Sequence, residues 1–237
     1  TPLSWLGAVQ ISLGNDEFAK ADSLLKPILA KSPNQIEVQA KLGAVIAGSR
    51  QTDLSEWAAK LPVEMHPDIW RIRGTLARSQ GQVKTAIRCF VEALKLDPDS
   101  NTSNYQLGQL LALDGDAESS QWFLSRSDQL SRLDRIIRDS DHMIRDESSK
   151  ESLPEMRKAA ELNYELGRYW EAKAWSVVAI KRDSSLEWAT AMMDRVRGKL
   201  QKNSPRHQPD SRRANRIDLA GFPLPTSSLK STSSNHN

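Results

Sequence analysis

The stretch from Pro67 to Pro98 constrains the fold most, because it combines very small and very large side chains at helical spacings. Small residues let two paired helices approach closely, while the aromatic rings of Trp70 and Phe90 fill the space beside them. The small residues that allow this approach are Gly74, Ala86 and Ala93, whereas Gly81 lets the chain reverse between the two helices. Because a single helix pair leaves apolar surface uncovered, this stretch predicts neighbouring pairs that cover it.

The same arrangement recurs along the chain in frames of about 34 residues. Besides the frame at Pro67, a second clear frame begins at Leu153, and frames from Pro2 and Asn101 keep part of the pattern. A frame from Ile36 is about three residues short of the usual period. Strand formers are sparse, with only 4 Phe and 3 Tyr. We therefore predict an all-α stack of about five antiparallel helix pairs.

These pairs are expected to cover residues 2–186, and a further helix is expected to follow and reach about Leu200. The apolar residues of that last helix recur every four positions, as expected of a helix laid over the exposed end of a stack. They are Trp188, Met192, Val196 and Leu200.

One segment departs from the repeat. Residues 117–146 contain neither proline nor glycine, so we expect one sustained helix there. Its apolar side chains at Phe123, Leu130, Ile137 and Ile144 recur every seven residues, which leaves two interpretations. The segment is either a coiled-coil seam or, as the missing second apolar column favours, an over-long second helix packed on its neighbours.

The spacing of small, aromatic and proline residues resembles the tetratricopeptide repeat (TPR), most clearly in the frames from Pro67 and Leu153. The resemblance implies a right-handed solenoid of antiparallel helix pairs with a C-terminal capping helix. It also implies a non-enzymatic scaffold that binds a peptide or protein segment in its concave groove. We expect residues 1–200 to form this repeat domain.

A second resemblance extends beyond the repeat. The runs "HPDIWRIRG", "AIRCFVEAL", "YQLGQLLA", "GRYWEAKAW" and "IDLAGFPLP" look like the helical region of bacterial multidomain proteins that also carry FG-GAP propeller repeats and an ASPIC/UnbV module. That resemblance implies an alternative function, in which the solenoid is a structural or regulatory segment that packs on a neighbouring domain of a larger protein.

In TPR proteins the first helix of each pair lines the groove, so the resemblance implies a set of partner-binding residues. They are Lys41, Arg71, Thr75, Arg78, Tyr105, Gln106 and Gln109. This surface would be polar and mildly basic, and the expected guest is an extended or helical segment with acidic residues. The lysine and asparagine clamp by which some family members hold a C-terminal carboxylate is not reproduced.

No residue pattern predicts catalysis, a cofactor or a metal site. The 4 histidines are scattered without ligand spacing, and no glycine-rich phosphate loop precedes a helix. Cys89, the single cysteine, is expected to be a small buried or half-buried hydrophobe. Trp57 and Trp122 fit no position of the repeat, so each is either an exposed anchor for a partner or, as we favour, a packing residue.

The charge of the chain is concentrated in its tail, which we take to be residues 201–237. The formal net charge is +3, and the tail carries six cations and two carboxylates, so 6 − 2 = +4 leaves about −1 for residues 1–200. A neutral body argues against nucleic-acid binding. The tail lacks helical periodicity and is expected to be a disordered basic tail or linker. No apolar run reaches the roughly 18 residues that span a membrane. Compartment and oligomeric state stay open.

Overall fold

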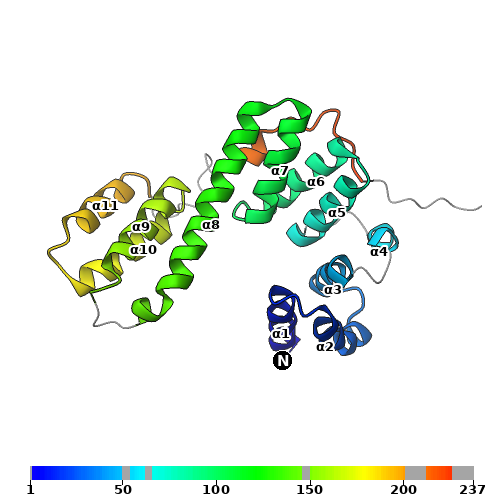
Figure 1. Cartoon of the computed structure of the whole chain (residues 1–237), viewed down its shortest axis with the longest axis horizontal. Helices are drawn as coiled ribbons and strands as arrows, with labels where there is room; N and C mark the ends of the chain where they lie inside the picture. Colours follow the sequence, from blue (N-terminus) through cyan, green and yellow to red (C-terminus); the bar gives the residue numbers. More distant parts are fainter. Residues whose placement is uncertain (1, 50–53, 62–65, 146–149, 201–211, 226–237) are drawn as a thin grey trace, which may run out of the picture. The chain divides into compact units, whose positions relative to one another are not determined.

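The computed structural model describes residues 2–49, 54–61, 66–145, 150–200 and 212–225, and within these ranges it contains helices and no strand (Figure 1). The prediction of an all-α chain of paired helices is confirmed. The pairs are α1 (Pro2–Gly14) with α2 (Phe18–Lys31), α3 (Ile36–Ser49) with α4 (Leu54–Lys60), α5 (Pro67–Ser79) with α6 (Val83–Leu96), α7 (Asn101–Asp114) with α8 (Ala117–Arg145) and α9 (Leu153–Glu165) with α10 (Tyr169–Arg182). The last helix, α11 (Glu187–Arg197), is followed by the short 3-10 helix η2 (Arg213–Arg216).

The chain divides into two compact units. The first unit comprises Thr1–Asp97 and Asp218–Asn237, and so holds α1 to α6. The second unit comprises Pro98–Ile217 and holds α7 to α11 with η2.

In the first unit the helix pairs stack in chain order. Each first helix contacts the second helix of its own pair, and α3 contacts both α1 and α5, the first helices before and after it. The cores follow the same order, since Ala40 of α3, Trp57 of α4 and Ile69 of α5 share one buried cluster. Burial of one pair's apolar side chains against the next pair is therefore what holds this unit together.

Glycines mark the closest approach of the paired helices. A Cβ atom added to Gly74 would lie 2.9 Å from the ring of Phe90, and one added to Gly108 would lie 2.7 Å from Cγ of Leu124. Both contacts join the small position of a first helix to the large position of its second helix. This is the small-against-large pairing that the repeat spacing predicts.

Trp57 packs in the same way. Its ring lies 2.2 Å from where a Cβ atom of Gly43 would be, and the side chain is 6% exposed. The packing interpretation of Trp57 is therefore confirmed, because a side chain this buried cannot anchor a partner. Trp122 is half-buried, with its ring edge-on to Phe123 at a centroid distance of 4.9 Å.

In the second unit the long helix α8 contacts α7 and α9 (Figure 1). Leu130 and Leu133 of α8 are buried against Leu162 and Leu166 from α9 and its end. The sustained helix is confirmed, and its packing agrees with an over-long second helix that lies on its neighbours. Ile137 is 38% exposed, whereas the side chain of Ile144 lies outside the described residues.

A buried ionic cluster fixes α8 in place. The guanidinium of Arg126 donates to the carbonyl oxygens of Pro98, at 3.2 Å, and Leu166, at 3.1 Å, and lies 2.8 Å from Oδ1 of Asp99. Oδ2 of Asp99 is 3.4 Å from Nε of Arg168. Burial lowers the pKa of Arg126 and the charge of Asp99 opposes that shift. One carboxylate thus joins the loop before α7, α8 and the turn between α9 and α10.

The last α-helix packs as predicted. Met192 and Val196 of α11 are buried against Ala160 and Ala172, so α11 covers the preceding pair. The helix ends at Arg197, and Leu200 continues past it to pack on the same cluster.

Of the segment expected to be a disordered tail, the structure describes residues 212–225. They include η2, in which Ala214 is 3% exposed. Residues 201–211 and 226–237 lie outside the described part of the chain, and the domain boundary at residue 200 stays a prediction.

Candidate functional site

The candidate site begins with the first turn of α5. Pro67 is the first residue of this helix, where its fixed backbone angle suits the helix and its missing N–H costs nothing. His66 precedes it as the N-cap, and its Nδ1 accepts a hydrogen bond from the backbone N–H of Asp68 at 3.2 Å. Desolvation by burial lowers the pKa of His66, so the imidazole is held in the neutral form that accepts this bond.

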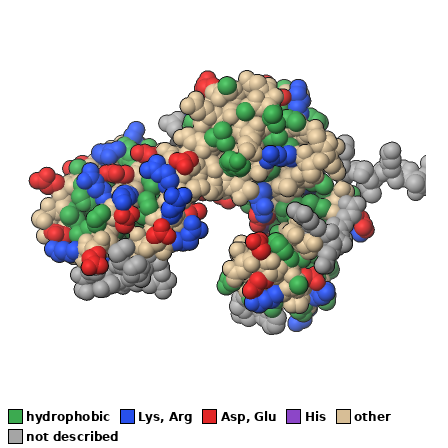
Figure 2. All heavy atoms as spheres, viewed as in Figure 1, with side chains coloured by type: hydrophobic (Ala, Val, Ile, Leu, Met, Phe, Trp, Pro, Cys, Tyr) green, Lys and Arg blue, Asp and Glu red, His purple; other side chains and the backbone are tan. Residues whose placement is uncertain are grey.

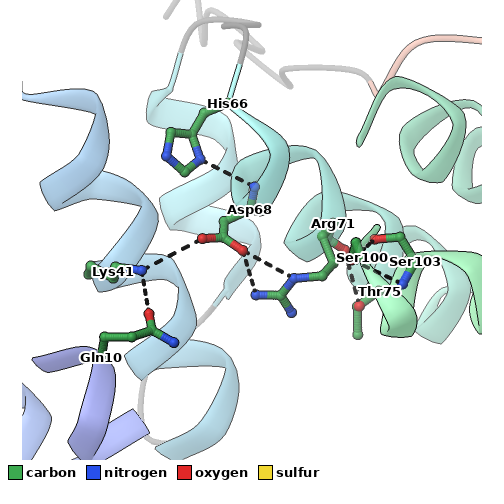
Figure 3. A network of polar contacts seen from close by, with 8 residues as sticks. All are labelled: Gln10, Lys41, His66, Asp68, Arg71, Thr75, Ser100 and Ser103. Carbon is green, nitrogen blue, oxygen red and sulfur yellow. Dashed lines mark hydrogen bonds and ion pairs between the residues drawn. The ribbon is translucent and has the colours of Figure 1, made fainter. Parts of the chain in front are cut away.

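Asp68 is the centre of a network that crosses three helices (Figure 3). Nη2 and Nε of Arg71 lie 3.1 Å and 3.3 Å from its Oδ1, while Nζ of Lys41 lies 3.7 Å from its Oδ2. Lys41 also donates to Oε1 of Gln10 at 2.5 Å. The first helices α1, α3 and α5 are therefore linked side by side through polar side chains. We call Gln10, Lys41, Asp68 and Arg71 the Asp68 network.

The charged members of this network are neither fully buried nor free in solvent. The side chains of Lys41, Arg71 and Asp68 are 19%, 30% and 36% exposed. Two cations and one carboxylate give a local formal charge of 2 − 1 = +1. The face is thus weakly basic, with donors and acceptors already oriented by one another.

The structure brings together some of the predicted partner-binding residues. Lys41 and Arg71 meet at Asp68, and Thr75, one turn further along α5, is exposed and donates from Oγ1 to the carbonyl oxygen of Arg71 at 3.1 Å. Arg78 lies on the same helix and is exposed. Their shared placement on first helices agrees with the prediction, but their role in binding stays a prediction.

Asp68 was absent from the predicted set, although a signal for it existed. In the frame that begins at Pro67, Asp68 occupies the second position, which faces the groove in TPR proteins just as the positions of Arg71 and Thr75 do. The predicted set held cationic and neutral polar residues but not this carboxylate, which neutralises one of the cations.

The remaining predicted residues lie on α7 in the second unit. Tyr105 is 46% exposed, and its hydroxyl oxygen accepts a hydrogen bond from Nε2 of Gln109 at 2.7 Å. Gln106 is half-buried on the same helix. These three residues form a polar surface on α7.

A second surface involves the C-terminal strip, which we define as residues 218–225. Gly221 has φ of 81°, and Phe222 donates its N–H to the carbonyl oxygen of Leu219 at 3.1 Å, so a tight turn presents the Phe222 ring. Arg88 of α6 donates to the carbonyl oxygen of Phe222 at 3.5 Å, and Nζ of Lys84 lies 5.9 Å from the ring centroid. The strip therefore contacts a second helix of the first unit.

Other chemistry finds little support in the described residues. Cys89 is fully buried, and burial raises the pKa of its thiol to about 12, so it is protonated at neutral pH and unsuited to nucleophilic attack. Among the described residues no three His, Cys, Asp or Glu side chains gather in a way that could hold a metal ion. None of the described helices combines the length and apolar character needed to cross a membrane.

Charges of both signs are mixed on the surface. On the face shown in Figure 2, Lys and Arg side chains alternate with Asp and Glu over the α9 to α11 region. A large field of one sign, the usual footprint of nucleic-acid binding, is not what this face presents.

A family profile described as TPR repeat matches residues 74–115, which run from within α5 to the residue after α7. No curated protein matches the chain significantly. The resemblance to multidomain proteins with FG-GAP and ASPIC/UnbV modules stays a prediction.

Proposed function

We propose that this chain, which carries tetratricopeptide repeats, binds a peptide or protein segment on the polar face of α1, α3 and α5. TPR repeats generally mediate protein–protein interaction and are generally non-catalytic. The observation that supports this face is the Asp68 network, because it joins three consecutive first helices through Gln10, Lys41 and Arg71.

The geometry suits recognition of a segment. Each charged side chain of the network is held by another, so less side-chain entropy is lost when a ligand binds. The exposed residues Thr75 and Arg78 continue the face along α5. Three cations, Lys41, Arg71 and Arg78, stand against the two carboxylates of Asp68 and Glu37, so the face keeps a small positive charge that weakly favours a guest with acidic residues. We propose that Tyr105, Gln106 and Gln109 of α7 contact ligands of the same class.

A charge-reversal experiment tests this proposal. Twelve-residue library peptides would be selected on the full chain, and their affinities measured by fluorescence anisotropy. The double variant Arg71→Glu with Arg78→Glu should weaken binding at least about fivefold, because it places two like charges opposite an acidic guest.

The matched control is Lys26→Glu with Lys60→Glu. Both lysines are 71% exposed and lie on the second helices α2 and α4, so the net charge changes equally while the polar face is untouched. Equal affinities for the two double variants would remove this face from consideration.

The alternative function, packing on a neighbouring domain of a larger protein, draws support from α10. Trp170 and Val178 are 37% and 39% exposed and lie two turns apart on this second helix, so they form an apolar surface. If that function is the true one, the library selection should yield no peptide whose affinity depends on Arg71.

A further inference from the structure

The Asp68 carboxylate occupies the space between two cations where the carboxylate of a ligand would be drawn. Its Oδ1 faces Arg71 and its Oδ2 faces Lys41 (Figure 3). We propose that Asp68 is a specificity-determining residue that competes with ligand carboxylates and so sets the charge preference of the polar face. This inference rests on the proposed function, since it concerns ligands of that same face.

Asp68 is held firmly in this position by local structure. It is the second residue of α5, where the partial positive charge of the helix N-terminus favours a carboxylate. Arg71 follows three residues later on the same helix, at a spacing that lets the two side chains meet. The contact with Arg71 therefore forms within α5 and is in place before any ligand arrives.

The consequence for a ligand follows from charge. The pair of cations alone would present +2 to a carboxylate, whereas the three groups together present +1. A ligand carboxylate that approaches Arg71 and Lys41 also meets the like charge of Asp68, and displacing Asp68 breaks two contacts as new ones form. The gain from a carboxylate over a neutral amide of the same shape is therefore small in the native chain.

A purely structural role for Asp68 makes a different prediction. The helix cap is supplied by His66, not by the carboxylate of Asp68, and Lys41 reaches Asp68 from another helix. Loss of a merely structural ion pair would change stability and would affect acidic and neutral ligands equally. A change in the preference between them separates the two roles.

The experiment compares matched peptides. Each library peptide that binds the full chain is synthesised with its carboxylates and again with every Glu and Asp replaced by Gln and Asn. A peptide without carboxylates is paired with a copy that carries Gln→Glu substitutions. The charge preference is the ratio of the two affinities. We expect a ratio below about twofold for the native chain and a rise of about three- to fivefold in Asp68→Asn, because one surface charge contact has about that effect.

Three further measurements make the result specific. Asp68→Glu should keep the charge preference of the native chain. The double variant Asp68→Asn with Arg71→Gln should bring the charge preference back toward the native value. The increase in Asp68→Asn should shrink at high salt, where exposed charges are screened. Asp68→Ser, which keeps an oxygen near the helix N-terminus, repeats the test if Asp68→Asn does not fold.

The outcomes separate the inference from the proposed function. If peptides bind in a way that depends on Arg71 but the ratio is the same in Asp68→Asn and the native chain, Asp68 does not determine specificity, and the binding face stands. If no peptide binds either protein, the binding face itself is wrong and the role of Asp68 falls with it.

Discussion

At the scale of single residues, the buried Arg126 shows how a charge can hold distant turns together. Its guanidinium is bonded to Pro98, Asp99 and Leu166, and the residue is 4% exposed. Arg126→Met removes the guanidinium, so the carboxylate of Asp99 and the carbonyl groups of Pro98 and Leu166 each lose a hydrogen-bond donor. We expect the free energy of unfolding, from urea denaturation, to fall by about 3 kcal/mol.

The control for this prediction is Arg157→Met. Arg157 pairs with Glu161 on the surface of α9 and is 55% exposed, so its removal should change the free energy of unfolding by less than about 1 kcal/mol. Similar effects of the two substitutions would show that the Arg126 cluster adds no more than a surface ion pair.

The sequence alone could not predict the Arg126 cluster. The partners of Arg126 lie 27 to 40 residues away, and nothing local to α8 indicates that this arginine turns inward. Trp57 was ambiguous for the same reason, because its burial depends on Gly43 in another helix. Gly74 and Phe90, in contrast, were predictable, since both belong to one repeat frame.

At the scale of elements, the N-terminus of α5 carries a titratable cap. The pKa of His66 is lower in the folded chain than its ordinary value of 6.5, so the unfolded chain binds more protons between the two values. The contribution of His66 is therefore fully present above about pH 7 and is lost as the pH falls through 6.5 toward the folded pKa.

The measurement is thermal or urea unfolding at pH values from 7.5 to about 5. His66→Asn keeps a capping side chain but does not titrate. The native chain should lose more stability on acidification than this variant does, while the other histidines are common to both proteins. Parallel pH profiles would mean that His66 titrates alike in the folded and unfolded chains.

Helix pairs were the part of the fold that sequence predicted best. The long α8 followed from the lack of glycine and proline over 117–146, and the cover provided by α11 followed from its four-residue stripe. The sequence did not predict that the C-terminal strip contacts α6. Its apolar residues were visible in the sequence, but Lys84 and Arg88 lie more than a hundred residues earlier.

At the scale of the whole molecule, stacking of the helix pairs places residues from different repeats on one surface. Burial of each pair against the next orders α1, α3 and α5 side by side, and this order brings Gln10, Lys41 and Arg71 to one face. The resemblance to TPR proteins implied that first helices would supply the binding face, but the predicted residues included none from α1. The contact between Asp68 and Lys41 was not predictable, because Lys41 lies on α3 and the sequence does not show how α3 and α5 pack.

The central claim is that ligands bind to the face formed by the first helices. The most direct measurement is a titration of the uniformly 15N-labelled full chain with the tightest library peptide, followed through backbone amide chemical shifts. We predict that the largest shifts fall on residues of α1, α3 and α5 around Gln10, Lys41 and Arg71. Shifts that fall instead on the second helices α2, α4 and α6 would contradict the claim.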